Sequence, residues 1–126
     1  DTNTSLSIRI ITDERLNELK ISEQPVLILF AMPRCPYCLK SRQVAEKLEY
    51  KLNTTIYWLE SQSNQNSLKQ FGVDMQFPTF LVVSQNIINK YSGPIKEDRI
   101  LEWAMLQMNI STIIEPPIIE YKKVEL

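Results

Sequence analysis

Pro25-Val-Leu-Ile-Leu-Phe-Ala-Met-Pro-Arg-Cys-Pro-Tyr-Cys38 is the stretch that decides the fold of this 126-residue chain. It begins with a continuous apolar run, Val26–Met32, of the kind found in a central strand that is covered on both faces. Pro36 suits the first turn of a helix, where its missing N–H costs nothing. Apolar residues then recur at helical spacing as far as Leu52. The stretch therefore predicts a buried strand that delivers a Cys-x-x-Cys pair to the N-terminus of a long helix.

Cys35 and Cys38 are the only two cysteines in the chain. Their spacing lets one thiol attack a substrate disulfide while the other stays within reach to resolve the mixed disulfide. Because a helix N-terminus stabilises a thiolate, we expect Cys35 to be the nucleophile and Cys38 to be the shielded, less acidic resolving thiol. Arg34 adds a positive charge beside Cys35 unless its side chain points to solvent. The alternative is an inert local disulfide, which closes too short a loop to stabilise the chain much.

The composition excludes several other classes of protein. Hydrophobic residues make up 44% of the chain and charged residues 23%, as in a single globular domain. A net charge of −1 gives no electrostatic case for nucleic acid or an anionic membrane, and no apolar run approaches the roughly 20 residues that span a bilayer. Histidine is absent, so Cys-His and Ser-His nucleophile pairs are excluded. We expect no metal site within one chain, although two chains together could share one.

The remaining patterns predict an α/β fold. Strands are expected over residues 6–12, 26–32, 54–59, 79–83 and 87–91, and helices over 12–19, 36–52, 66–72 and 96–108. The resulting β-α-β-α-β-α-β-β-α order predicts a mixed sheet of about five strands with helices on both faces. The cysteines then lie at the carboxyl end of a central strand, where open α/β sheets place their chemistry. Residues 1–110 are expected to form the domain, and 111–126 a C-terminal tail.

Over about positions 6–108 the chain resembles the thioredoxin superfamily. The motifs that carry the resemblance are Pro25–Ala31, Cys35-Pro-Tyr-Cys38, Phe71-Gly-Val73, Phe77-Pro78-Thr79 and Tyr91-Ser-Gly93. The resemblance implies a thioredoxin fold in which Pro78 follows a cis peptide bond and lies against the active-site sulfurs, with Pro36, Tyr37 and Arg34 supporting the site. It also implies that Phe77 presents its backbone to an extended substrate strand. The alternative is an ordinary trans proline at the start of a strand.

The branch of the superfamily is a separate question. The Pro36-Tyr37 dipeptide is typical of glutaredoxins, whereas its surroundings resemble thioredoxin and protein disulfide isomerase domains. Glutaredoxins usually carry Thr-Val-Pro at the cis-proline and a Gly-Gly loop that binds glutathione, but this chain has Gln76-Phe77-Pro78 and no Gly-Gly. The resemblance therefore favours a protein disulfide isomerase/thioredoxin-like enzyme that needs no cofactor beyond its own disulfide, and disfavours a glutathione site.

Two positions depart from the family. Thioredoxin-like enzymes commonly bury an acid shortly before the first cysteine, paired with a lysine on the third strand. Leu29 and Trp58 occupy the equivalent positions. We therefore expect water or the released substrate thiolate to accept the proton of Cys38.

Three features bear on location. Asn-x-Ser/Thr triplets begin at Asn3, Asn53 and Asn109, where about one would arise by chance. Lys123-Val-Glu-Leu126 resembles a variant of the Lys-Asp-Glu-Leu retrieval signal, and the alternative is an ordinary solvated, charged terminus. The chain starts at Asp1 rather than Met, as after removal of a leader. These features favour the secretory pathway and its endoplasmic reticulum lumen. A bacterial extracytoplasmic or a cytoplasmic location is the alternative.

We therefore expect a monomeric thiol-disulfide oxidoreductase that exchanges disulfides with protein substrates. One alternative is a glutaredoxin-like, glutathione-dependent reductase. Another is a redox-active client-binding or chaperone module with little turnover, to which the isoleucine pairs Ile113-Ile114 and Ile118-Ile119 would dock a partner. Packing of those isoleucines on their own domain is favoured over docking. The sequence leaves the substrate, the direction of exchange and the host open.

Overall fold

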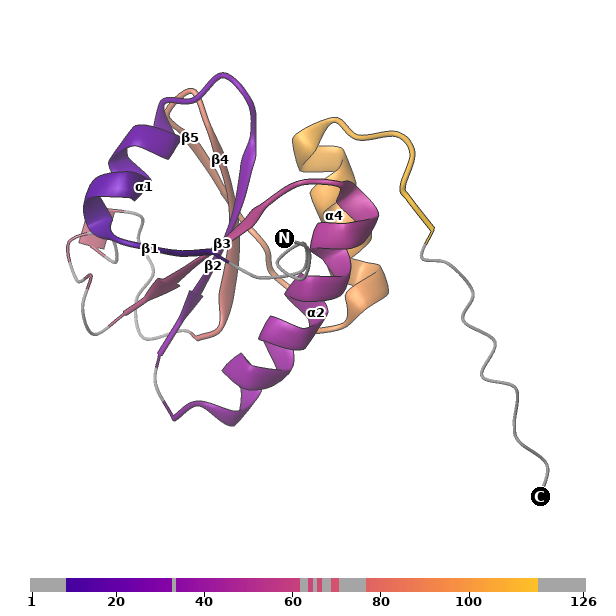
Figure 1. Ribbon diagram of the computed structural model, residues 1–126, viewed down its shortest axis with the longest axis horizontal. Coiled ribbons are helices and arrows are strands. Elements are labelled where there is room, and N and C mark those ends of the chain that lie inside the picture. Colours follow the sequence, from indigo (N-terminus) through magenta and orange to yellow (C-terminus); the bar gives the residue numbers. More distant parts are fainter. Residues whose placement is uncertain are drawn as a thin grey trace, which may run out of the picture.

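The computed structural model describes residues 9–32, 34–61, 64, 66, 69–70 and 77–115 (Figure 1). In chain order its elements are β1 (Arg9–Ile11), α1 (Asp13–Lys20), β2 (Val26–Ala31), α2 (Pro36–Leu52), β3 (Ile56–Glu60), β4 (Thr79–Ser84), β5 (Ile87–Lys90) and α4 (Glu97–Met108). The strands form one five-stranded sheet in the order β1-β3-β2-β4-β5. Strand β2 is parallel to β3 and antiparallel to β4, so the sheet is mixed. The predicted α/β architecture is confirmed.

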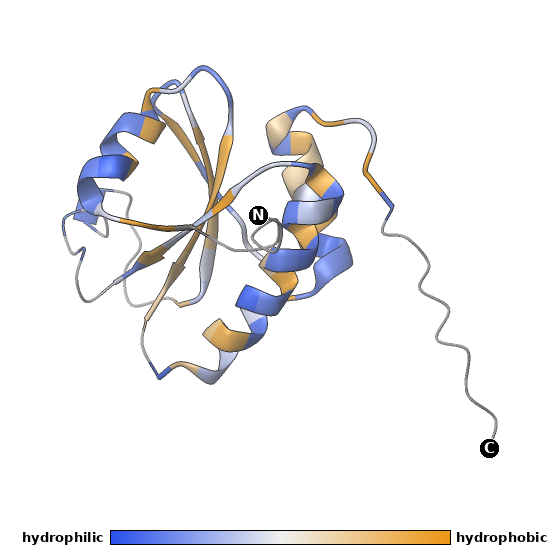
Figure 2. Cartoon of the chain, in the orientation of Figure 1, coloured by the Kyte–Doolittle hydropathy of each residue, from blue (hydrophilic) through white to orange (hydrophobic). Residues whose placement is uncertain are grey.

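Strand β2 is buried along its whole length, as its continuous apolar run predicts. Leu27 and Leu29 pack with α2 and α4 on one face of the sheet, whereas Ile28 and Phe30 pack with α1 on the other. Figure 2 shows the largely apolar strands of the sheet between helices that carry both hydrophilic and hydrophobic residues. Strand β2 therefore packs into a separate hydrophobic core on each face of the sheet, and this packing holds in place the strand that leads to the cysteines.

Helix α2 spans the predicted range, but β3 begins later than the pattern suggests. Asn53 has a left-handed backbone (φ 52°) and ends α2, and the N–H of Thr54 returns to the Glu49 carbonyl at 3.2 Å. This turn uses the residues that were predicted to open the strand. A side-chain oxygen of the buried Glu49 then accepts the N–H of Ile56 at 3.0 Å, which ties the end of α2 to the start of β3.

Other predicted boundaries shift by a residue or lie outside the described part of the chain. Strand β5 ends at Lys90 rather than Tyr91, and Lys96 is the N-cap of α4 rather than its first residue. Of the helix predicted over 66–72, Asn66, Lys69 and Gln70 are helical. Its other positions, and residues 6–8 of the first predicted strand, lie outside the described residues.

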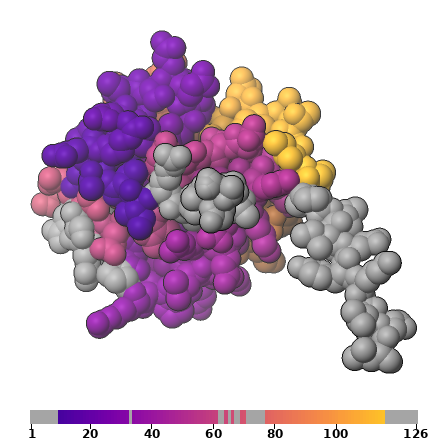
Figure 3. All heavy atoms as spheres, in the orientation of Figure 1, coloured from indigo at the N-terminus to yellow at the C-terminus, as the bar shows by residue number. Residues whose placement is uncertain are grey.

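The chain beyond α4 reaches the C-terminal end of α2. Ile114 donates its N–H to the carbonyl of Lys51 at 2.8 Å, and the Lys51 ammonium pairs with Glu97 at 2.6 Å. Figure 3 shows this segment in yellow against the magenta end of α2. Residues 110–115 contain no helix or strand, and Ile113 is half-buried, so this part of the tail packs on its own domain. The rest of the predicted tail, residues 116–126 with the Ile118-Ile119 pair, lies outside the described residues. Among the helices in the part of the chain that the structure describes, none combines the length and the apolar character needed to span a membrane.

Candidate active site

Cys35 lies where β2 ends and α2 begins. Arg34 makes the turn between them with a left-handed backbone (φ 59°), and its side chain is exposed to solvent. Cys35 follows in an extended conformation as the N-cap of α2, and Pro36 occupies the first helical turn as predicted. The buried strand β2 thus places Cys35 at the N-terminus of α2, where the first backbone N–H groups of the helix are free.

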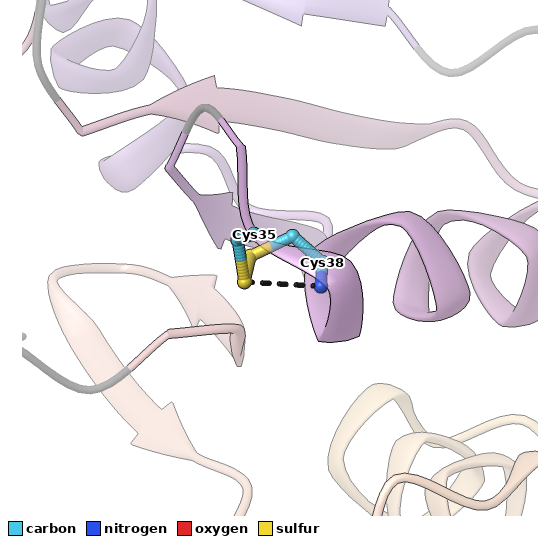
Figure 4. The surroundings of a disulfide bond; sticks show 2 residues. All are labelled: Cys35 and Cys38. Atoms are coloured by element: carbon cyan, nitrogen blue, oxygen red, sulfur yellow. Dashed lines mark hydrogen bonds between the residues drawn. A yellow bond between two sulfur atoms is a disulfide. The ribbon is translucent and has the colours of Figure 1, made fainter.

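The two cysteines are joined by a disulfide, with their Cα atoms 5.1 Å apart (Figure 4). The Cys35 sulfur accepts a hydrogen bond from the backbone N–H of Cys38 at 3.1 Å. Cys38 is 2% exposed and Cys35 7% exposed. An amide aimed at sulfur favours the ionised form of that sulfur once the disulfide is reduced. The arrangement gives Cys35 the support that a thiolate nucleophile needs and leaves Cys38 the more buried of the pair.

Apolar groups from β2, from β3 and from the segment just before β4 surround the disulfide. Ala31 is buried with the two cysteines, and Trp58 and Phe77 pack against the same cluster. The Phe77–Pro78 peptide bond is cis, as the resemblance implies. Thr79, the next residue, pairs with Phe30 near the carboxyl end of β2. The cis bond therefore lies at the end of the sheet from which the chain continues to the cysteines. The contact of Pro78 with the sulfurs and the role of the Phe77 backbone stay predictions.

Exposed apolar side chains flank the pair in the sequence. Tyr37 is 69% exposed and Leu39 65%, both in the first turns of α2, and Met32 just before the turn is 42% exposed. We call Met32, Tyr37 and Leu39 the apolar rim. Exposed apolar side chains beside a reactive disulfide offer contact area to a client chain.

Leu29 and Trp58, the two residues that differ from the family pattern, are neighbours in the sheet. Leu29 and Trp58 are directly opposite each other in the β2–β3 register, and Leu29 is fully buried in the larger core. Sequence reasoning missed Arg42, whose guanidinium carbon lies 5.7 Å from the centroid of the Trp58 ring. Its place one helical turn after Cys38 is the signal that would have found it. An apolar pair with a cation over the indole thus replaces the acid–lysine pair of the family.

Sequence reasoning also missed Ser41. This serine lies on the same face of α2 as Cys38, three residues further on, and it is fully buried. Its hydroxyl has no hydrogen-bond partner among the described residues. A buried serine inside an apolar helical pattern carries no sequence signal of its own, because the pattern predicts only that the position faces the core.

The thioredoxin family model matches residues 7–105. The chain belongs to the thioredoxin family. Its five-stranded mixed sheet is that of the thioredoxin fold, and Cys35 and Cys38 are its Cys-x-x-Cys pair.

Solved structures agree on the fold. Thioredoxin from Malassezia sympodialis matches with a TM-score of 0.69 at 18% identity, over 81% of this chain and 90% of that one. The first thioredoxin domain of mouse protein disulfide-isomerase A4 matches with a TM-score of 0.69 at 16% identity, over 90% and 84%. The J-Trx1 fragment of ERdj5 matches with a TM-score of 0.69 at 15% identity, over 83% of this chain and 53% of the fragment, so this chain spans about half of that fragment. No curated protein matches the sequence.

Proposed function

We propose that this protein is a thiol-disulfide oxidoreductase that exchanges disulfides with protein substrates in an oxidising compartment of the secretory pathway. The observation that carries the proposal is the Cys35 sulfur at the N-terminus of α2, with the Cys38 amide 3.1 Å away. A thiolate in that position is both stabilised and able to attack.

The exchange runs in two steps. In the reduced enzyme, the Cys35 thiolate attacks one sulfur of a client disulfide, forms a mixed disulfide and expels the other client sulfur as a thiolate. Cys38 then loses its proton and attacks the Cys35 sulfur, which closes the enzyme disulfide and releases the client as a dithiol. The reverse sequence donates the enzyme disulfide to a reduced client. Because Leu29 and Trp58 carry no acid or base, the expelled client thiolate or water takes the proton of Cys38.

A protein client fits this site better than a small thiol. The apolar rim supplies contact area for a chain, and Phe77, which packs against the cysteines, would present its backbone beside the sulfurs. The chain has no Gly-Gly loop of the kind with which glutaredoxins bind glutathione. Clients that carry apolar side chains next to their cysteines are therefore the expected substrates.

Trapping tests the proposal. Cys38→Ala removes the resolving thiol, so client proteins should accumulate on Cys35 as disulfide-linked adducts that a reductant releases. Cys35→Ala is the matched control and should trap no adduct through the buried Cys38. A reduced Cys38→Ala protein that captures nothing from oxidised clients would refute the proposal.

Two further variants separate the alternatives. Full activity of Cys38→Ser on a glutathione mixed disulfide would indicate a glutaredoxin-like monothiol route, which needs only Cys35. Retention of clients after removal of both cysteines would indicate a binding module. The direction of exchange follows from the reduction potential of the pair, measured against glutathione. A value near about −270 mV favours reduction of clients, and one between about −180 and −120 mV favours isomerisation or oxidation.

A further inference from the structure

Two helices of this protein end on asparagines with the same backbone geometry. Asn53 ends α2 with φ 52°, and Asn109 ends α4 with φ 60°. In each case the asparagine N–H bonds the carbonyl three residues earlier, and the next N–H bonds the carbonyl five residues earlier. This is the Schellman arrangement, in which glycine is the usual left-handed residue. The chain uses asparagine at both places.

Both asparagines also begin an acceptor triplet for N-linked glycans. Asn53-Thr54-Thr55 and Asn109-Ile110-Ser111 have a hydroxyl residue two positions after the asparagine and no proline between them. Both asparagine side chains are exposed, and Ser111 is exposed as well. The turn at the end of each helix therefore holds the side-chain amide on the surface with open solvent around it. The third triplet, at Asn3, lies outside the described residues.

The two asparagines lie at the end of the molecule opposite the cysteines. Cys35 is the N-cap of α2 and Asn53 its C-cap, so a helix of 17 residues separates them, which is about 26 Å at 1.5 Å per residue. Asn109 borders a hollow of about 460 Å³ together with Pro25 and Gln85. Pro25 precedes β2, whereas the cysteines follow it, so this hollow is at the far end of the central strand.

We propose that Asn53 and Asn109 are N-glycosylated, which rests on the secretory location proposed above. The side-chain nitrogen of each asparagine attacks the first sugar of a lipid-linked oligosaccharide diphosphate. A nitrogen–carbon bond forms, the sugar–phosphate bond breaks, and the amide gives up one proton as the lipid diphosphate departs. No electron transfer takes place. The glycans cover the end of the domain where α2 and α4 finish, and they leave the apolar rim and the cysteines open to clients.

The test is expression of the full chain behind a cleavable leader in a eukaryotic secretory host. The intact mass of the secreted protein is measured before and after treatment with a peptide N-glycosidase, which converts each modified asparagine to aspartate. Thr55→Ala and Ser111→Ala should each remove one glycan. Asn53→Gly and Asn109→Gly should do the same while keeping the left-handed turn, so the loss is not an effect of misfolding. Asn17→Gln, an exposed asparagine outside any triplet, should change nothing.

A folded, secreted chain with unmodified Asn53 and Asn109 would overturn the proposal, as would a glycan found only at Asn3. Occupancy at one of the two overturns it for the other. Client trapping on the same proteins carrying Cys38→Ala as well reports the proposed function separately: trapping without glycans refutes the glycosylation alone, and glycans without trapping refute the exchange alone. Removal of the glycans should leave the rate of trapping unchanged within about twofold, because they lie far from Cys35.

Discussion

Replacing Gly93 with alanine should destabilise this protein, because the added methyl group meets a side chain that is held in place. Gly93 has φ +156°, and an added Cβ would lie 2.8 Å from the Tyr91 hydroxyl and 3.1 Å from the ring carbon that bears it. That ring is not free to swing aside. Its hydroxyl donates to the Pro94 carbonyl at 2.6 Å, and the ring packs edge-to-face with Trp103, with the ring centroids 5.3 Å apart.

The expected loss in the free energy of unfolding is the sum of the backbone cost at position 93 and the Tyr91 contacts that are lost. A residue with a side chain in this backbone region costs of order 1–3 kcal/mol. Displacing Tyr91 loses a hydrogen bond worth about 0.5–1.5 kcal/mol and an edge-to-face contact of about the same size. We therefore expect Gly93→Ala to lower the free energy of unfolding by about 2–4 kcal/mol, because the loop can relax in part.

Urea unfolding of the oxidised protein, followed by far-ultraviolet circular dichroism, measures the loss. Tyr91→Ala is the matched background, because every close contact of the added methyl is with Tyr91. In that background the same alanine should cost only the backbone contribution, about 1–3 kcal/mol. The contribution from displacing Tyr91 is then absent, so the two changes should be coupled by at least about 1 kcal/mol. A single variant as stable as the parent, or two changes that simply add, would refute the reasoning.

Three further predictions concern α2, Tyr91 and the nucleophile. Glu49→Ala leaves the buried N–H of Ile56 without its carboxylate acceptor and should cost about 1–3 kcal/mol in urea unfolding; a loss below about 0.5 kcal/mol would contradict the role of this bond. Burial raises the pKa of Tyr91 above its usual value of 10.0, with Asp98 adding to the rise and Arg99 opposing it. The unfolded chain therefore ionises first, and stability should fall as the pH rises beyond about 10; Tyr91→Phe should show a shallower fall, and equal slopes would count against the prediction. When the reduced protein is alkylated at a series of pH values, Cys35 should become reactive at a pH well below that at which a free thiol does. A pH profile like that of a free thiol would remove the basis for its assignment as nucleophile.

The unit around the cysteines could be predicted because its signals are local. The apolar run of β2, the proline in the first turn of α2 and the helical spacing up to Leu52 lie next to one another in the sequence, and each specifies its own segment. The cis bond before Pro78 followed instead from the resemblance, since no spacing in this chain specifies it. The family motifs thus supplied a backbone feature that composition and periodicity do not encode.

What the sequence could not predict depends on register and on local turns. That Leu29 lies opposite Trp58 is a property of how β2 and β3 align, and that Arg42 lies over Trp58 depends on the packing of α2 on the sheet. The hairpin between β4 and β5 turns on Gln85 and Asn86, both with positive φ. Glycine is common at such turn positions, but the chain has only two glycines. Here an asparagine and a glutamine adopt the positive-φ backbone instead, and a sequence pattern that looks for glycine does not predict this.

The hydrogen bond from the Cys38 amide to the Cys35 sulfur also bears on how a client departs. In a mixed disulfide with a client, Cys35 is a leaving group, because a second client thiol that attacks the client's own sulfur expels it. A thiol whose anion is stabilised leaves faster, and the 3.1 Å contact stabilises this anion. With no acid at position 29 to help Cys38 compete, we expect captured clients to escape by rearranging their own disulfides more often than by being reduced.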